Sequence, residues 1–332
     1  MMAVSTTYRG FATQALHYFD RPHERVCREP LFSASAWRGS DLAADDSWVE
    51  RLERDEVGEL EAAVAGVKRA GRGMAEIGRA DFPLPALSRR IARWSQQLLS
   101  GRGFLLVRGI PVERWGEADS ALAYWGIGQH LGVPGGQNPD EELLGHVRDM
   151  GEEASNPFVR RYRTAGDIAY HCDLADVVGL MCLQPAAAGG ASRIVSSVAV
   201  YNELLRRRPD LVARLYQPFC LDTRNENGTP YVPVTPCCFS NGVLRTFYHS
   251  DYFRSAVRHD DVPDFTREEC ELLDLYEEIA ADPALYLDMQ FSDGDIQFIS
   301  NHVTLHARTA YRDDPDTARR RHLLRLWLSL EN

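Results

Sequence analysis

The sequence is short of basic residues. Its 332 residues contain 37 Lys and Arg against 48 Asp and Glu, which gives a net charge of −11. Proteins that bind nucleic acids usually carry a basic surplus, so this balance argues against a nucleic-acid partner. The oligomeric state cannot be read from composition.

The sequence also has no regularly spaced cysteines and no long apolar runs. Its seven cysteines are scattered, include the adjacent Cys237 and Cys238 to which we assign no role, and form no C-x-x-C pair. This distribution is typical of free thiols in a reducing compartment. No segment approaches the roughly 18 apolar residues of a membrane span, and the N-terminal residues have no apolar signal core. We therefore expect a cytoplasmic protein without a membrane partner.

The remaining composition, 44% hydrophobic and 26% charged, is that of an ordinary globular protein. We find no repeat, linker or low-complexity tract, and we expect a single domain over residues 1–332. Residues 1–100 are predicted to form a mainly helical wrapping, irregular over the first forty residues and helical over 46–71 and 85–103. Residues 101–330 are predicted to form the core.

Short apolar segments separated by Gly, Pro, Asn and Asp dominate the chain after Gly145. Short strands separated by turn residues are typical of a β-sandwich or barrel. Two helical segments, 198–216 and 266–286, interrupt the pattern. The sequence thus predicts a mainly β protein with flanking helices, in the α+β class.

A histidine and an aspartate, His171 and Asp173, stand two residues apart beside a strongly apolar segment. Side chains two apart on a strand share a face, and burying such polar groups is costly unless they are paired. The segment "NHVTLHART" supplies His302 and His306 as further candidate ligands. Two imidazoles and one carboxylate are the ligand set of non-haem Fe(II) oxygenases.

Arg325 stands among leucines in the apolar segment "RRRHLLRLWLSL", and Arg321 lies four residues earlier on the same predicted face. An arginine keeps its proton, so in a buried strand it needs an acidic partner or an anionic ligand. A structural salt bridge is one interpretation. The nearby candidate metal ligands favour a carboxylate cosubstrate, which guanidinium binds through two parallel hydrogen bonds.

Taken in order, "HCD", "GGASRIVSS", "NHVTLHART" and "RRHLLRLWL" resemble the taurine dioxygenase-like branch of the Fe(II)/2-oxoglutarate-dependent oxygenases, over roughly residues 100–330. The resemblance implies a clavaminate synthase-like double-stranded β-helix, or jelly roll, that uses Fe(II), 2-oxoglutarate and O2. It implies Fe(II) ligation by His171, Asp173 and His306, with His302 and Cys172 structural. It further implies that the distal carboxylate of 2-oxoglutarate binds Arg325, with cosubstrate contacts from Arg321 and Ser192.

The same resemblance implies oxidation, most simply hydroxylation, of an unactivated C–H bond in a small polar metabolite with an anionic or amino-acid head. Desaturation and cyclisation need the same ligands, whereas chlorination is disfavoured because Asp173 is retained. A non-catalytic cupin-like binding protein and a zinc hydrolase with the same three ligands remain alternatives. The candidate substrate residues are Gln137, Asn138, His146, Arg148, Tyr170 and Arg308.

Overall fold

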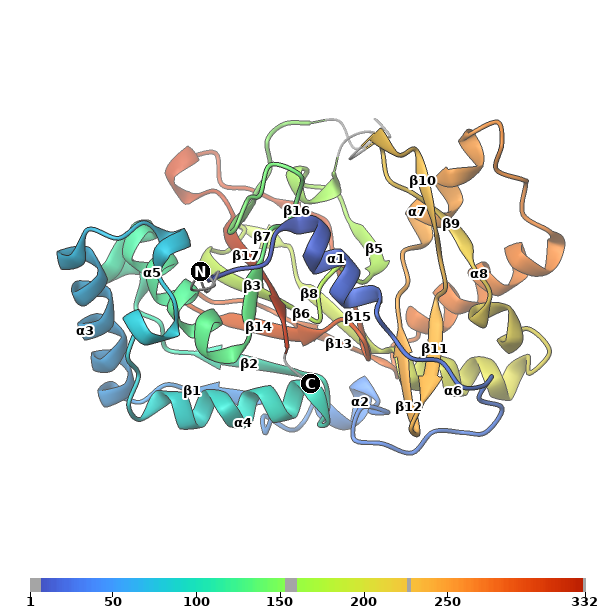
Figure 1. Cartoon of the computed structure of the whole chain (residues 1–332), viewed down its shortest axis with the longest axis horizontal. Helices are drawn as coiled ribbons and strands as arrows, with labels where there is room; N and C mark the ends of the chain where they lie inside the picture. Colours follow the sequence, from blue (N-terminus) through green and yellow to red (C-terminus); the bar gives the residue numbers. More distant parts are fainter. Residues whose placement is uncertain (1–6, 153–159, 226–227, 331–332) are drawn as a thin grey trace, which may run out of the picture.

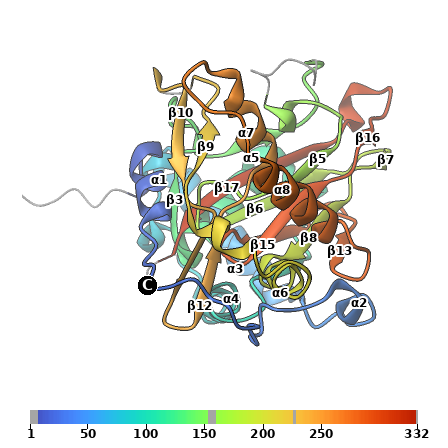
Figure 2. The same ribbon diagram turned by 90° about the vertical axis from the view of Figure 1, so that its right-hand side faces the viewer.

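The computed structural model describes residues 7–152, 160–225 and 228–330 and contains two sheets that face each other (Figures 1 and 2). The main sheet has the order β1 (Val49–Arg51), β2 (Phe104–Arg108), β14 (Ile296–Ser300), β6 (Val177–Gln184), β17 (His322–Ser329) and β3 (Val133–Gly135), and β4 (Gly145–Val147) also pairs with β17. The second sheet has the order β13 (Tyr286–Met289), β8 (Ser192–Ser196), β15 (Thr304–Arg308) and β5 (Ile168–His171).

Three two-stranded sheets complete the β structure. They are β9 (Phe219–Asp222) with β10 (Tyr231–Val234), β11 (Cys237–Ser240) with β12 (Val243–Thr246), and β7 (Ala188–Gly189) with β16 (Tyr311–Arg312). The α-helices are α1 (Phe11–Phe19), α2 (Gly39–Leu42), α3 (Arg54–Ala70), α4 (Leu87–Leu99), α5 (Val112–Leu131), α6 (Ser197–Arg207), α7 (Ser250–Ser255) and α8 (Arg267–Ala280). The 3-10 helices are η1 (Met74–Glu76), η2 (Arg79–Asp81), η3 (Arg161–Arg163), η4 (Val212–Tyr216), η6 (Ala256–Arg258) and η7 (Thr317–Arg319).

Strand β17 shows how the sequence pattern produces the two faces of the main sheet. Leu324, Leu326 and Leu328 pack in the core that the main sheet shares with α4 and α5. The alternate residues Arg325 and Trp327 point the other way, into the space between the sheets. Side chains alternate across a strand, so one apolar strand can bury leucines on one face and present functional groups on the other.

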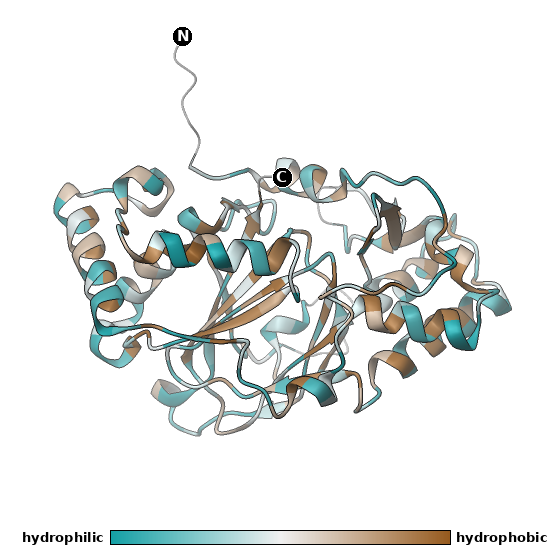
Figure 3. Cartoon of the chain, turned by 90° about the horizontal axis from the view of Figure 1, so that it is seen from below, coloured by the Kyte–Doolittle hydropathy of each residue, from teal (hydrophilic) through white to brown (hydrophobic). Residues whose placement is uncertain are grey.

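Helices cover the outer face of each sheet. α4 and α5 pack on the main sheet, and α6, with α8 behind it, packs on the second sheet, so the two groups lie on opposite sides of the molecule (Figure 1). The helices carry hydrophilic residues on their outer faces, whereas the strands between them are mainly hydrophobic (Figure 3). None of the helices in the described parts of the chain is both long and apolar enough to cross a membrane.

The predicted fold class is confirmed, with local corrections. The helix expected over 198–216 ends at Arg207 and is followed by the separate η4, and the helix expected over 266–286 ends at Ala280, before β13 begins at Tyr286. The first forty residues are not all irregular, because α1 forms there and lies across the front of the sandwich (Figure 1). The helix expected over 46–71 begins only at Arg54, because residues 49–51 form β1, which pairs in parallel with β2 of the main sheet. The predicted boundary between wrapping and core near residue 100 remains a prediction.

The contact between α5 and the loop after η2 gives a stability prediction. A Cβ added at Gly126 of α5 would overlap the ring of the buried Phe82, whereas a Cβ at Gly66 of α3 would meet nothing within 4 Å. Overpacking a core costs about 1–3 kcal/mol, while Gly to Ala in an open helical position gains about 0.5–1 kcal/mol. Urea unfolding should therefore show Gly126→Ala destabilised and Gly66→Ala stabilised. A stabilised Gly126→Ala variant would contradict this packing.

Candidate metal centre

Three metal-ligating side chains meet between the two sheets. His171 is the last residue of β5, Asp173 follows it by two residues, and His306 lies in the middle of β15. β5 and β15 are antiparallel neighbours in which His306 stands opposite His171. The pairing brings together side chains that lie far apart in the sequence. Asp173 lies just beyond the strand, not within it as the spacing had suggested.

The ligand atoms are arranged around a common point. One ligand atom from each side chain lies within 4.8 Å of the others, and Nε2 of His306 is 3.8 Å from Oδ2 of Asp173. Nδ1 of His171 lies 2.9 Å from the carbonyl oxygen of Ala169, which accepts its proton. The Nε2 atom of His171 is therefore left as the ligand atom. Within the described chain, the one other group of this kind is Glu117, His146 and His322.

The protonation states suit metal binding. Burial alone would raise the pKa of Asp173, but Arg325, His306 and His171 and a hydrogen bond from Trp327 lower it to about 2. The indole Nε1 of Trp327 donates to Oδ2 of Asp173 over 3.1 Å. Burial, with the neighbouring His171, lowers the pKa of His306 to about 3. An ionised carboxylate and a neutral imidazole are the ligand forms that Fe(II) requires, so the residues fit this metal.

Arg325 lies directly beside the metal ligands. Its Nη1 is 3.6 Å from Oδ1 of Asp173, and its Nε donates to Oε1 of Gln137 over 2.7 Å. Gln137 is fully buried and donates through Nε2 to the carbonyl oxygen of Arg325 over 2.8 Å. The predicted substrate residue Gln137 therefore holds Arg325 in place and does not line the cavity.

Arg321 and Arg308 form a second buried cationic group. Both guanidinium groups lie against the ring of Tyr311, with Cζ 4.9 Å and 4.8 Å from its centroid respectively. Burial, followed by repulsion from Arg321, lowers the pKa of Arg308 to about 10, and burial also lowers the pKa of Arg321. Arg308 was predicted to contact substrate. It donates instead through Nη2 to the carbonyl oxygens of Thr164 and Gly166.

Several N–H groups of this pair have no acceptor. Among the described residues, Nη1 of Arg321 and both Nε and Nη1 of Arg308 are buried without a hydrogen-bond partner. Gly190 has φ +71°, and a Cβ there would stand 3.2 Å from Nε of Arg321, so glycine leaves room for the guanidinium group. Ser192 stands opposite Arg308 in the β8–β15 pair, and its hydroxyl donates to Oε1 of Gln297 over 2.9 Å. Two buried cations with free donors are suited to an anion.

The other predicted substrate residues make contacts elsewhere. Asn138 donates a hydrogen bond to the carboxylate of Glu142 and accepts one from its backbone N–H, and these bonds stabilise the loop between the two residues. His146 bonds to His322, and Arg148 lines a separate polar cavity. Tyr170 is buried in the core beneath α6 and α8. None of the four is among the described residues that line the cavity over the metal ligands.

His302 and Cys172, which were expected to be structural, make packing and hydrogen-bond contacts. Nε2 of His302 lies 2.8 Å from Oδ1 of Asp176, and its ring stacks on Tyr18 with centroids 4.7 Å apart. His302 precedes β15, so it does not share the face of His306 as a regular strand would require. Cys172 is buried in the core, which fits a packed thiol.

The cavity over the metal ligands has a volume of about 860 Å³. His171, Asp173, Arg325 and Trp327 form its floor, α1 forms one wall, and β9 and β10 contribute another. Sequence reasoning missed the residues that distant segments bring to this cavity. They are Arg21, Arg160, Arg161, Tyr162, Arg224, His249 and Tyr252. Only their polar character is visible in the sequence, and no spacing rule connects these segments to the metal ligands.

Comparison with known proteins agrees with this geometry. The "FR-33289 synthase" of Streptomyces rubellomurinus is 29% identical over 319 residues, which cover 92% of each chain. The "Taurine hydroxylase-like protein SAT17" of Stachybotrys chartarum is 27% identical over 323 residues, which cover 92% of this chain and 82% of the other.

Among solved structures, an asparagine oxygenase in complex with Fe(II), 2S,3S-3-hydroxyasparagine and succinate has a TM-score of 0.66 at 15% identity, covering 85% of this chain and 93% of the other. That likeness supports the jelly-roll fold. The taurine catabolism dioxygenase TauD, TfdA family matches residues 68–327, which is most of the chain. The chain therefore belongs to this family and is an Fe(II)/2-oxoglutarate-dependent dioxygenase.

Proposed function

We propose that this dioxygenase hydroxylates an unactivated C–H bond of a small polar metabolite with an anionic or amino-acid head. His171, Asp173 and His306 would hold the Fe(II) ion. The observation that carries the proposal is the position of two imidazoles and an ionised carboxylate at the floor of a cavity of about 860 Å³. Bound Fe(II), with 2-oxoglutarate and O2, supplies the oxidising chemistry, and the protein supplies binding and orientation.

The arrangement of the arginines supports an exchange of the roles predicted for Arg325 and Arg321. Arg325 already pairs with the metal ligand Asp173, so its charge lies close to the metal. The free donors of Arg321 and Arg308 lie against the ring of Tyr311. Arg308 is two residues beyond His306, which is about 6.4–6.8 Å along a strand. A five-carbon diacid with its keto-acid end on the metal spans a comparable distance. We propose that Arg321 and Arg308 bind its distal carboxylate.

In this arrangement Arg325 would interact with the anionic groups nearest the metal. Its guanidinium lies over the rings of Tyr162 and Trp327, with Cζ 4.8 Å and 5.1 Å from the two centroids. These rings and Gln137 fix its orientation, so that it faces the cavity as a preformed cation. A fixed cation beside the reactive centre would orient an anionic substrate group, or the metal-bound end of the cosubstrate.

The charge of the cavity supports an anionic or zwitterionic substrate. Arg21, Arg160, Arg161, Arg224 and Arg325 line it. Of its carboxylates, Asp173 is a metal ligand, Asp222 accepts hydrogen bonds from Arg258, and Asp251 pairs with Arg161 over 3.2 Å. Arg21 donates to the carbonyl oxygen of Thr235 and Arg325 to the amide of Gln137, so these two arginines bring positive charge to the cavity. The asparagine oxygenase with a related fold acts on an amino acid, which is consistent with this class.

The alternatives are less well supported. A cupin-like binding protein would not need the three ligands and the arginines together, and the family assignment favours neither it nor a zinc hydrolase. The seven free cysteines support the predicted cytoplasmic location. The absence of a nucleic-acid partner remains a prediction.

Removal of the carboxylate ligand tests the function. Asp173→Ala should abolish Fe(II)- and O2-dependent formation of succinate from 2-oxoglutarate, because one of three ligands is lost. The circular dichroism spectrum should be unchanged. His302→Gln is the matched control, because His302 bonds to Asp176 and not to the metal site, and it should retain iron. Full turnover by Asp173→Ala would show the ligand assignment to be wrong, and activity with Zn²⁺ in the absence of O2 would favour the hydrolase.

The roles of the two arginines can be separated by titration. Breaking a buried ion pair typically costs about 3–5 kcal/mol, so Arg321→Gln should weaken 2-oxoglutarate binding by about 100-fold or more. Arg325→Gln should change it by less than about tenfold. The measurement is an anaerobic titration of the Fe(II) protein that follows the visible charge-transfer band of the chelate. If the larger loss occurs in Arg325→Gln, the original assignment of the distal carboxylate to Arg325 is correct.

A further inference from the structure

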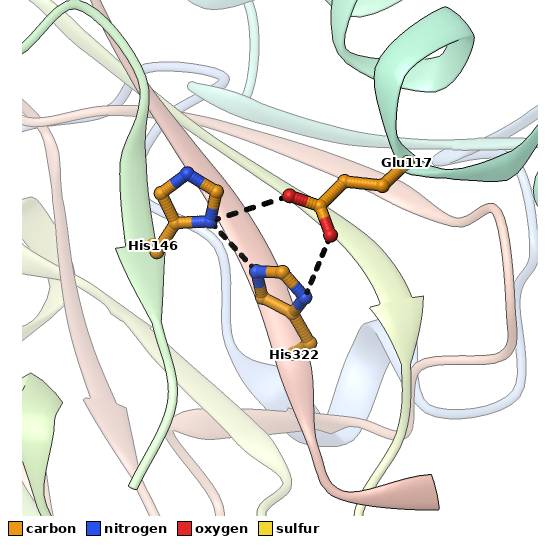
Figure 4. Close-up of side chains that lie close together, drawn as sticks. All are labelled: Glu117, His146 and His322. Atoms are coloured by element: carbon orange, nitrogen blue, oxygen red, sulfur yellow. Dashed lines mark hydrogen bonds and ion pairs between the residues drawn. The ribbon is translucent and has the colours of Figure 1, made fainter. Parts of the chain in front are cut away.

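A second cluster of metal-ligating side chains lies outside the cavity over the Fe(II) ligands. Glu117 of α5, His146 of β4 and His322 of β17 point toward one another (Figure 4). One ligand atom from each lies within 4.8 Å of the others, the same criterion that the Fe(II) ligands meet. None of the three has a part in the oxygenase chemistry described above.

The backbone fixes the positions of the three residues. His146 stands opposite Leu324 in the β4–β17 pair, and His322 stands opposite Gln184 in the β17–β6 pair. Glu117 follows Gly116, whose φ of +71° bends the chain inside α5 and starts the second segment of that helix. The main sheet thus sets the backbone positions of both imidazoles and a packed helix sets that of Glu117, whose side chain is 57% exposed.

The distances are close to those of a bound ion. Nδ1 of His146 lies 2.8 Å from Nε2 of His322 and 3.9 Å from Oε1 of Glu117, whereas the other ring nitrogen of His322, Nδ1, lies 3.8 Å from Oε2 of Glu117. One ion would use a single nitrogen of His322, and with one atom from each residue the three ligand atoms lie within 4.8 Å of one another. Ligand atoms at about 2.0–2.1 Å from a tetrahedral ion lie about 3.3 Å apart, so small side-chain movements would suffice. The Fe(II) ligands show a similar spacing, with 3.8 Å between His306 and Asp173.

The chemistry of the cluster selects the kind of ion. In the hydrogen bond between the two rings the accepting nitrogen carries no proton, so at least one ring is neutral imidazole, which is the ligand form. Imidazole and carboxylate ligands suit Zn²⁺ and related transition ions. Glu117 and His322 border a polar cavity that also holds Arg148 and Arg320, which leaves space for a water or small anion as a further ligand.

We propose that Glu117, His146 and His322 form a second divalent-metal site of the Zn²⁺ class, distinct from the Fe(II) site. The bound ion would join α5 to β4 and β17 and so stabilise the segment that carries Arg321. This inference does not depend on the substrate or on the oxygenase reaction. A metal ion that binds the folded chain and not the unfolded chain stabilises the folded state.

The test is metal stoichiometry after equilibrium dialysis of the metal-free protein against Zn²⁺. The wild-type chain should bind two equivalents, because Zn²⁺ can also occupy His171, Asp173 and His306. His306→Gln and His146→Gln should each bind one tightly, and the double variant none. In the His306→Gln background, Zn²⁺ should raise the melting temperature. One equivalent on the wild-type chain, or two on His146→Gln, would overturn the proposal.

A matched pair of variants in α5 separates ligation from general charge. Glu117→Gln and Asp119→Asn each remove one negative charge, but Asp119 pairs with Lys68 and lies outside the cluster. In the His306→Gln background, Glu117→Gln should weaken Zn²⁺ binding by about 10- to 100-fold, and Asp119→Asn should leave it unchanged. Equal weakening by both would show that Zn²⁺ responds to surface charge and that Glu117 is not a ligand.

Discussion

The buried carboxylate of Asp173 is the group on which the rest of the structure depends. It lies on the loop after β5, accepts a hydrogen bond from Trp327 of β17, pairs with Arg325 of the same strand, and faces His306 of β15. A buried carboxylate is costly unless it is paired and hydrogen-bonded. The main sheet therefore supplies Trp327 and Arg325, which interact with this carboxylate, and the second sheet supplies the imidazoles of His171 and His306. The carboxylate links the two layers at the point where a metal can bind.

Three arginines, Arg308, Arg321 and Arg325, are buried near the candidate metal ligands. Arg325 donates a hydrogen bond to Gln137 beside the candidate metal ligands. Arg321 and Arg308 lie against the ring of Tyr311, and each has buried N–H groups without an acceptor. Burial lowers the pKa of Arg308 to about 10, and repulsion from Arg321 adds to this shift. In the proposed arrangement, an anion with two carboxylates would place one carboxylate at these arginines and its other end at the metal. The mutual repulsion of Arg308 and Arg321 would thus favour the binding of a diacid.

The sequence predicted the parts of the fold that depend on local pattern. Strand β6 and strand β17 follow from continuous apolar segments, and α8 follows from its periodicity and its Thr266 cap. The residue types beside apolar segments and the resemblance together indicated His171, Asp173 and His306 as candidate ligands, and the structure brings these three side chains together. α1 was missed, since nine residues with few capping signals give a weak helical pattern.

Contacts between distant residues could not be predicted in this way. Gln137 is 188 residues from Arg325, and His146 is 176 residues from His322, so neither pairing leaves a trace in local spacing. Gln137 and His146 were expected to contact substrate because they are polar and precede the metal motif. In the structure Gln137 hydrogen-bonds to Arg325, and His146 hydrogen-bonds to His322. Tertiary register, not composition, decides these roles.

The most direct test of the central claim is an anaerobic crystal structure with Fe(II) and 2-oxoglutarate bound. The account predicts metal density in contact with His171, Asp173 and His306, and a distal carboxylate hydrogen-bonded to Arg321 and Arg308. Arg325 should remain paired with Asp173. A metal ion held by other side chains would contradict the assignment of the site. A distal carboxylate bound to Arg325, with Arg321 and Arg308 still lacking acceptors, would contradict the proposed division among the arginines.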